Sequence, residues 1–183
     1  RVMRGEELGG VELRRLRKDG SPVDIAVWTT RLVDQHGTVI GSMSLQVDTT
    51  EHKRAKEALR MQARVLENML EGVSLSDENG VLLYTNQAEN AMFGYEPGEL
   101  IGKHVTVLNT YPPEENARIV EGVIEQLKTK GFWGGEFSNR RKDGTTFITS
   151  ARITALELSG KKHWVCVQTD ITERKKAEEA LRE

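Results

Sequence analysis

The sequence DTTEHKRAKEALR at residues 48–60 returns as DITERKKAEEALR at residues 170–182, with nine of thirteen positions identical at an offset of 122. The tetrad RKDG also occurs twice, at residues 17–20 and 141–144, at an offset of 124. Both long copies are rich in alanine, leucine, lysine, glutamate and arginine, which favour helices. The chain therefore contains two copies of one unit, and each copy ends where a helix begins.

Each copy predicts a three-stranded antiparallel meander in front of that helix. Segments rich in β-branched and aromatic residues alternate with glycine or charged turns. The glycine of each RKDG tetrad supplies the positive φ that such a turn needs. The expected strands lie at residues 11–16, 23–33 and 39–47 in the first copy and at residues 133–140, 145–156 and 163–169 in the second.

The second copy is preceded by elements that the first copy lacks. Two short strands, at residues 72–77 and 81–85, flank an Asn-Gly turn, which is a strong hairpin signal. Short helical turns follow over residues 86–104, and Pro113 begins an amphipathic helix that runs to Lys130. Its expected buried face carries Ile119, Val123, Ile124 and Leu127. The first copy has only ten residues before its meander, so we expect its sheet to expose apolar surface.

The repeated phrase also predicts how strand turns into helix. Asp48 and Asp170 each stand three residues before a glutamate, which indicates a capping box. The hydroxyls of Thr50 and Thr172 are further acceptors at the helix start. After the first junction comes a heptad-like stripe, made of Ala55, Leu59, Gln62, Leu66, Met69 and Val73. Such a stripe indicates a helix that packs either on its own domain or against a second chain.

The order and spacing of several phrases resemble a PAS domain with its C-terminal PAC segment. These phrases are GVSLSD at 72–77, YTN at 84–86, FGYEPGELIGK at 93–103, FWGGEF at 132–137, NRRKDG at 139–144 and DITE at 170–173. The resemblance implies an α+β protein with the PAS fold, a five-stranded antiparallel sheet with helices on one face, preceded by a partial PAS β-meander and a connecting helix. The expected segments are the later, PAC-like part of a first PAS domain at 1–50, the connecting amphipathic helix at 51–70, a complete PAS domain at 71–171 and the start of a signalling helix at 172–183.

The resemblance further implies a sensory role. PAS modules typically occur in bacterial sensor histidine kinases, nucleotide cyclases and chemoreceptors, where they enclose a pocket and pass a signal through the helix after the last strand. We expect this chain to bind a small ligand or cofactor, to form a homodimer, or both, and to act on an output domain outside the sequence. The alternative is a ligand-free PAS module that only dimerises or docks partners. Since Arg1 is not a natural start, the sequence is expected to be a piece of a longer protein.

The candidate pocket combines aromatic, aliphatic and amide side chains. Alternation along the last strand places Trp164, Cys166 and Gln168 on one face. The resemblance to LOV proteins, a subclass of PAS domains, implies polar contacts to a flavin ring at Asn139, Thr149 and Gln168. The full set of pocket candidates is Tyr84, Phe93, Ile119, Val123, Trp133, Phe137, Asn139, Phe147, Thr149, Trp164, Cys166 and Gln168, and the signal joint is Asp48, Thr50, Asp170 and Thr172.

The residues leave the cofactor open: none, a small metabolite or a flavin. LOV photochemistry is not expected because residues 109–116 contain no cysteine for the flavin adduct, and haem is not expected because the helix at 113–130 contains no histidine. No metal site is expected, since His163 and Cys166 stand three apart on a strand and point to opposite faces. The GGEF at residues 134–137 resembles a diguanylate cyclase signature with one acidic residue missing, so we interpret it as part of a strand.

The composition is that of a globular domain with a mixed charged surface. It is 37% hydrophobic and 30% charged, with 26 basic and 28 acidic residues and a net charge of −2. This balance argues against nucleic acid or an anionic membrane as the main partner. The sequence has no apolar run long enough for a transmembrane helix, and its only cysteine, Cys166, fits a cytoplasmic location. No catalytic motif stands at a recognisable spacing, so the chain itself is not expected to be an enzyme.

Overall fold

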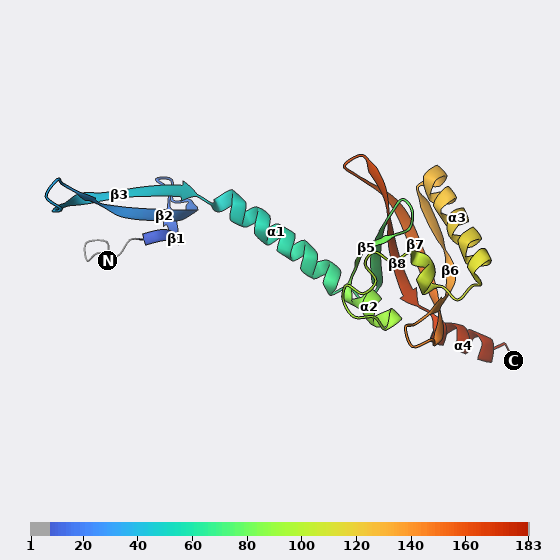
Figure 1. Cartoon of the computed structure of the whole chain (residues 1–183). Helices are drawn as coiled ribbons and strands as arrows, with labels where there is room; N and C mark the ends of the chain where they lie inside the picture. Colours follow the sequence, from blue (N-terminus) through green and yellow to red (C-terminus); the bar gives the residue numbers. More distant parts are fainter. Residues whose placement is uncertain (1–7, 183) are drawn as a thin grey trace. The chain divides into compact units, whose positions relative to one another are not determined.

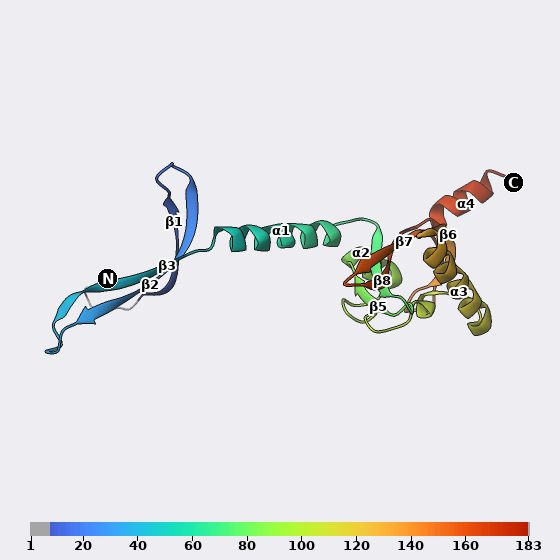
Figure 2. The same ribbon diagram turned by 90° about the horizontal axis from the view of Figure 1, so that it is seen from above.

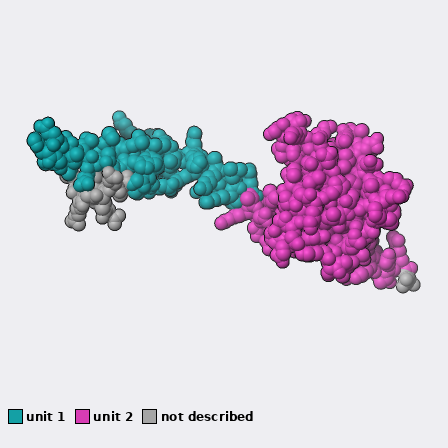
Figure 3. All heavy atoms as spheres, viewed as in Figure 1, with its two compact units in different colours: residues 1–62 teal, residues 63–183 magenta. Residues whose placement is uncertain are grey.

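A computed structural model describes residues 8–182 of the chain. The chain forms two compact units that divide between Gln62 and Ala63, inside one helix (Figure 3). Each unit contains its own antiparallel sheet. The segments predicted at 1–50 and 172–183 reach into residues 1–7 and 183, which lie outside the described range.

The first unit is the predicted three-stranded meander. Its strands are β1 (Leu8–Leu16), β2 (Pro22–Val33) and β3 (Val39–Asp48), in the order β1-β2-β3, and both pairs are antiparallel. In the RKDG turn the Arg17 N–H donates to the Ser21 carbonyl. Gly20 has a φ of +81°, a conformation that glycine adopts without strain. The turn predicted from the tetrad is therefore confirmed.

The meander is largely uncovered within its own unit. Among the described residues of this unit, Ile25 and Ala26 are the buried apolar side chains. Met43, Leu45 and Val47 on β3 are 59%, 62% and 43% exposed. The expectation that this sheet exposes apolar surface is therefore confirmed. The helix α1 (Thr50–Glu67) begins directly after β3.

The second unit has a five-stranded antiparallel sheet in the order β5-β4-β8-β7-β6, which confirms the predicted fold class. Its strands are β4 (Gly72–Asp77), β5 (Leu82–Thr85), β6 (Phe132–Arg140), β7 (Thr146–Leu158) and β8 (Lys161–Asp170). Its helical elements are α2 (Gln87–Phe93), the 3-10 helix η2 (Val105–Leu108), α3 (Pro113–Lys130) and α4 (Thr172–Ala180). Figures 1 and 2 show α3 running alongside β6 and β7, whereas α4 leaves from the end of β8.

The core of the second unit lies between the sheet and its covering helices. One cluster consists of Leu82, Phe93, Leu100, Leu108 and Phe147, and a second consists of Val123, Leu127 and Trp164. The buried face of α3 is formed by Asn116, Val120, Val123 and Leu127, so the prediction that Ile119 belongs to it is wrong. The helix is turned because Asn116 points inward and donates from Nδ2 to the Thr106 carbonyl at 2.9 Å. Ile119 is consequently only half-buried.

The joint between β8 and α4 differs from the predicted capping box. The N-cap of α4 is Ile171, whose side chain makes no capping bond. The Asp170 carboxylate accepts from the Thr172 N–H at 2.9 Å and from the Thr172 hydroxyl at 2.6 Å. The same hydroxyl accepts from the Ile148 N–H of β7 at 3.0 Å. The capping-box prediction is therefore wrong, because the aspartate closes a local turn and the threonine attaches the helix start to the sheet.

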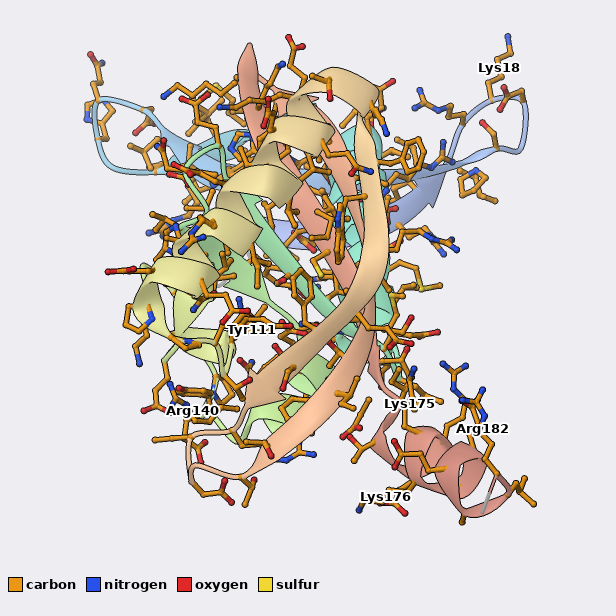
Figure 4. All side chains as sticks on the ribbon, turned by 90° about the vertical axis from the view of Figure 1, so that its right-hand side faces the viewer. Lys18, Tyr111, Arg140, Lys175, Lys176 and Arg182 are labelled. Carbon is orange, nitrogen blue, oxygen red and sulfur yellow. The ribbon has the colours of Figure 1, made fainter. Side chains whose placement is uncertain are left out.

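The first copy builds the same joint between β3 and α1. Asp48 accepts from the Thr50 N–H at 2.9 Å, and the Thr50 hydroxyl accepts from the Asp24 N–H at 3.0 Å. In both copies the RKDG arginine pairs with the aspartate, and a lysine early in the helix pairs with a glutamate of the first meander strand. These ion pairs are Arg17–Asp48 at 2.6 Å, Arg141–Asp170 at 2.8 Å, and Lys53–Glu12 and Lys175–Glu136, both at 2.8 Å. Figure 4 shows Lys175 where α4 leaves the sheet.

The predicted heptad stripe is interrupted at the end of α1. Because α1 ends at Glu67, Met69 lies beyond the helix. Val73 is a buried residue of β4 opposite Val167. The stripe prediction is therefore wrong beyond Leu66, since the chain turns there into the first strand of the second unit.

Asn86 makes hydrogen bonds to the chain on both sides of that turn. It is fully buried, and its Nδ2 donates to the carbonyls of Leu66 and Glu71, both at 3.0 Å. Its Oδ1 accepts from the N–H groups of Val73 and Glu89, both at 2.9 Å. One side chain therefore links the end of α1, the start of β4 and the first turn of α2.

Replacing Asn86 with alanine is expected to lower the free energy of unfolding of the second unit by about 3 kcal/mol, because four backbone groups lose a partner. In a Trp28→Phe background the remaining tryptophans, Trp133 and Trp164, both lie in this unit. Urea denaturation followed by their fluorescence then isolates its transition. The exposed neighbour provides a matched control, Gln87→Ala, expected to change the free energy by less than about 1 kcal/mol. Equal losses in the two variants would contradict the role assigned to Asn86.

Candidate functional site

A cavity of about 80 Å³ lies between the sheet and the helices of the second unit. Inward side chains of β4, β6, β7 and β8 form one wall, and those of α2, η2 and α3 form the other. Seven of the twelve pocket candidates line it, namely Phe93, Val123, Phe137, Asn139, Trp164, Cys166 and Gln168. The other five, Tyr84, Ile119, Trp133, Phe147 and Thr149, do not line it. The structure thus brings together most of the residues selected from the sequence, including the alternate row on β8.

Two aromatic candidates support lining residues from behind. Trp133 stacks on Phe137 with ring centroids 4.7 Å apart. Phe147 packs edge-on against Phe93 with centroids 5.0 Å apart. Trp133 and Phe147 therefore each hold in place a ring that faces the cavity, but they would not contact a ligand themselves.

Tyr84 faces away from the cavity because β5 contains a bulge. The register places Leu82 opposite Ser76, a cavity-lining residue, but Tyr84 opposite Leu75. Directly opposite residues share a face of the sheet, so Tyr84 lies on the other face. Its hydroxyl donates to Glu67 Oε1 at 3.0 Å. Simple alternation along β5 could not reveal this reversal.

Two amides of the predicted set line the cavity and are held through their NH2 groups. Asn139 Nδ2 donates to Thr149 Oγ1 at 2.6 Å, and Gln168 Nε2 donates to Glu89 Oε1 at 2.8 Å. Asn139 is 2% exposed and Gln168 is 6% exposed, so these hydrogen bonds are shielded from solvent. Buried amides without partners would destabilise the unit, and these partners prevent that cost.

A third amide, Asn109, was not selected from the sequence. It donates from Nδ2 to Asn116 Oδ1 at 2.8 Å, and Asn116 in turn donates to the Thr106 carbonyl. Asn109 follows η2, where a short helical turn hides any strand or helix period. No sequence pattern therefore indicates that this side chain faces inward.

Glu89 on α2 is the titratable residue that sequence reasoning missed. Its side chain is fully buried, and Oε2 makes no hydrogen bond with any described residue. Burial raises the pKa of Glu89 to about 7, although the hydrogen bond from Gln168 opposes the shift. A carboxyl group next to the cavity therefore titrates near neutral pH.

A sequence pattern does include Glu89, but it predicts an exposed side chain rather than a buried one. Asn86 and Glu89 have the spacing of a capping box, in which the glutamate reaches back toward the helix start and stays near the surface. Half of that motif forms, since Asn86 Oδ1 accepts from the Glu89 N–H. The carboxylate instead turns toward Gly72, where an added Cβ would lie 2.2 Å from Oε2. The glycine therefore makes room for the buried acid.

Two further cavity residues have buried polar atoms. Burial and then the negative charge of Glu89 raise the pKa of Cys166, so its thiol stays protonated and unreactive. The Trp164 Nε1–H has no hydrogen-bond partner among residues 8–182. Trp164 therefore contributes mainly apolar surface to the cavity wall.

A larger groove of about 970 Å³ opens beside η2 and α3. Asn109, Val120 and Ile124 line both the groove and the cavity, so they form the wall between them. Tyr111, labelled in Figure 4, lines the groove, and its hydroxyl accepts from the Ser138 N–H at 3.0 Å.

The size of the cavity limits what it can hold. A cavity of roughly 150 Å³ accommodates benzene, and about 80 Å³ is smaller. The ring system of a flavin or a haem therefore does not fit between these side chains as they stand. Among residues 8–182 no group of three or more His, Cys, Asp or Glu side chains could hold a metal ion. No helix in the described part of the chain is long and apolar enough to cross a membrane.

Arg141 connects the cavity wall to the joint. Its guanidinium pairs with Asp170 at 2.8 Å, donates to the Met92 carbonyl and lies 4.0 Å from the centroid of the Phe147 ring. Burial opposes ionisation of Asp170, but the hydrogen bonds from Thr172 and Arg141 outweigh it and lower the pKa of Asp170. The end of α2, the inner face of β7 and the end of β8 thus meet at one side chain.

Comparison with known proteins agrees with this architecture. The sensor protein FixL of Bradyrhizobium diazoefficiens is 24% identical over 159 residues, which are 82% of this chain and 31% of that protein. The sensor histidine kinase TmoS of Ectopseudomonas mendocina is 27% identical over 179 residues, which are 96% of this chain and 17% of that protein. The chain thus spans less than a third of the length of either relative.

A solved structure and a family model give the same assignment. The PAS domain of an HTR-like protein from Haloarcula marismortui has the same fold, with a TM-score of 0.59 at 20% identity over 66% of this chain and 98% of that one. The family model described as PAS domain matches residues 70–173, which include the whole five-stranded sheet and every cavity-lining residue. The chain belongs to the PAS domain family.

Proposed function

We propose that this chain is a sensory module in which a small molecule in the cavity alters the joint at the start of α4. The observation that supports the proposal is the path of β8. This strand lines the cavity as far as Gln168 and reaches the joint at Asp170, two residues further along. A ligand that displaces β8 would therefore change the position of the aspartate that holds the helix start.

A second route from the cavity to the joint runs through aromatic rings. Phe93 lines the cavity and packs on Phe147, and the Phe147 ring lies under the Arg141 guanidinium. Arg141 in turn pairs with Asp170. Both routes end on one carboxylate, so either a strand shift or a ring shift would act on the same ion pair.

We also propose the division into segments that the repeat indicates. Residues 1–50 are the later part of a first PAS domain, 51–70 form the connection, 71–171 are a complete PAS domain and 172–183 begin the signalling helix. The named relatives are a sensor protein and a sensor histidine kinase, which supports an output domain of two-component type. A cytoplasmic location is part of the same proposal.

Dimerisation through α1 is a further part of the proposal. Leu59 and Leu66 share the predicted stripe and are 66% and 39% exposed. Met61 and Val65 are 66% and 58% exposed but lie off the stripe. A helix of this length with apolar residues in water gains stability from a partner helix.

Protonation of Glu89, which accepts a hydrogen bond from the cavity residue Gln168, is expected to affect the stability of the second unit. The pKa of Glu89 is about 7 in the folded chain, above the ordinary value of 4.5. The folded state therefore binds this proton more tightly than the unfolded state, and the resulting stability is complete below about pH 4.5. It is lost as pH rises from about 4.5 to about 7 and is absent above that range.

Filling the cavity tests the sensory proposal. In Val123→Phe the added ring occupies the cavity, as a ligand would, and hydrogen exchange of the amides in residues 172–180 is expected to change by about fivefold or more. Ile119→Phe adds the same ring on the same helix outside the cavity and should leave exchange unchanged. In Thr172→Val the helix start loses the two hydroxyl bonds, to the Ile148 N–H and to the Asp170 carboxylate, so adding Val123→Phe should have little further effect. Identical exchange in the two phenylalanine variants would favour the ligand-free interaction module instead.

The dimer proposal predicts that Leu59→Glu with Leu66→Glu converts the protein to a monomer, because two buried carboxylates would face each other across the seam. Sedimentation velocity over a range of protein concentrations measures the change. Met61→Glu with Val65→Glu adds the same charge to the same helix off the stripe and should leave the dimer intact. If the protein with Leu59→Glu and Leu66→Glu is still a dimer, the dimer interface lies elsewhere on the molecule.

The Glu89 argument predicts a difference in pH dependence between the unmodified chain and Glu89→Gln. Relative to the variant, the free energy of unfolding of the unmodified chain should fall by roughly 3 kcal/mol between about pH 4.5 and pH 7 and stay level above it. Urea midpoints at a series of pH values, in the Trp28→Phe background, provide the measurement. Glu125→Gln alters an exposed carboxyl on α3 and serves as the control. Parallel curves for the unmodified chain and Glu89→Gln would rule out the shifted pKa.

A further inference from the structure

The three amides of the cavity share one arrangement of free atoms. Gln168, Asn139 and Asn109 each donate through the NH2 group to a protein acceptor. Their carbonyl oxygens accept no hydrogen bond from any residue of the described range. None of these oxygens is among the described polar atoms that are both solvent-inaccessible and without a hydrogen-bond partner. All three side chains line the cavity, so its lining residues include three amide oxygens without a donor among the described residues, whereas the NH2 groups of the same side chains are used.

Two of these orientations are fixed by partners that can only accept. The Thr106 carbonyl must receive the NH2 group of Asn116, which leaves Asn116 Oδ1 to accept from Asn109. Glu89 Oε1 receives the NH2 group of Gln168 when the carboxyl is ionised. The surrounding network therefore fixes the orientation of Asn109 and, when Glu89 is ionised, that of Gln168, whereas Asn139 pairs with the Thr149 hydroxyl, which can donate or accept.

The rest of the cavity wall is apolar or neutral. Phe93, Val120, Val123, Phe137 and Ile153 are among its lining residues, and the described lining includes no lysine, arginine or histidine. An anionic ligand would thus lose its hydration without meeting a cation, and it would face carbonyl oxygens with the Glu89 carboxyl behind them. A cation would likewise leave water without an ionised lining residue to pair with.

We propose that the cavity selects a small uncharged molecule that donates hydrogen bonds through an NH or OH group and carries a short apolar part, such as a primary amide. This inference rests on the proposed ligand-binding function and specifies the chemical class of the ligand. The cavity volume of about 80 Å³ is about half that of a cavity of roughly 150 Å³ that binds benzene, so it restricts the ligand to small molecules. A carboxylate or a purely accepting molecule would leave the three amide oxygens unpaired, whereas a donating group pairs with them.

The test compares three probes of nearly identical shape on the full chain. Propionamide, butan-2-one and propionate share an ethyl group and a carbonyl, and differ in carrying NH2, CH3 or O⁻ at one position. Titration of the 15N-labelled chain, followed by amide chemical shifts, gives a dissociation constant for each probe. Propionamide is expected to bind about tenfold or more tightly than either of the others, since a buried acceptor left unpaired weakens binding by about that factor.

Three variants locate the site. Val123→Phe should abolish the propionamide shifts by filling the cavity. Gln168→Met removes one free oxygen at nearly constant volume and should reduce the preference for propionamide over butan-2-one severalfold. Gln46→Met changes the exposed glutamine at the matching position of the first copy and should leave the preference unchanged. If Gln168→Met does not fold, Asn139→Leu replaces it, and the probe comparison on the unmodified chain needs neither variant.

The outcomes separate this inference from the proposal on which it rests. Butan-2-one or propionate could bind as tightly as propionamide, or more tightly, at a site that Val123→Phe abolishes. That result would overturn the preference for donors but would support a ligand-binding cavity. Propionamide binding that persists in Val123→Phe would overturn the inference, because the site would lie elsewhere. Absence of saturable shifts from all three probes would overturn both the donor preference and the ligand-binding function.

Discussion

Two hydrogen bonds of the Thr172 hydroxyl hold the last strand and the last helix of the second unit in place. The hydroxyl donates to Asp170 and accepts from the Ile148 N–H of the neighbouring strand, so it fixes the helix start to two strands at once. Thr50 accepts in the same way from the Asp24 N–H of β2. The two copies therefore contain the same joint, formed in each by an aspartate, a threonine, a lysine and the arginine of the RKDG tetrad. The joint needs only the meander, because it forms in both units.

Burial distinguishes the two copies more than sequence does. Gln46 and Gln168 both stand two residues before the closing aspartate, yet Gln46 is exposed and Gln168 is 6% exposed. Helices α2 and α3 cover the sheet in the second unit, and an amide that is hydrated in the first unit must there find a protein partner. Glu89 provides it, and its own carboxyl becomes a buried acid as a consequence. The cavity chemistry thus follows from covering the sheet rather than from the meander itself.

Periodic features of this fold could be predicted from the sequence, and local exceptions could not. The helix Pro113–Lys130 was predicted with its observed bounds, and the alternate row on β8 was placed on the cavity, because both rest on repeating patterns. Tyr84 was misplaced because one bulge in β5 reverses the face of every later residue. Glu89 was missed because its spacing from Asn86 indicates a surface cap, and burial depends on Gly72 in a different strand. Contacts between distant segments decided each of these cases.

The strengths of these contacts favour a signal that leaves through the joint without deforming the core. The Arg141–Asp170 and Lys175–Glu136 pairs are partly exposed, with side-chain exposures between 29% and 44%, and such pairs contribute about 0–1 kcal/mol each. No described residue of α4 is buried, so apolar packing adds little to its attachment. The Gln168–Glu89 contact at the cavity is buried, and breaking it leaves polar groups without water, at a cost of about 1–3 kcal/mol or more. A ligand that moves β8 slightly would therefore shift the weakly held helix before it disrupts the buried network, since the element with the smaller restoring free energy responds first.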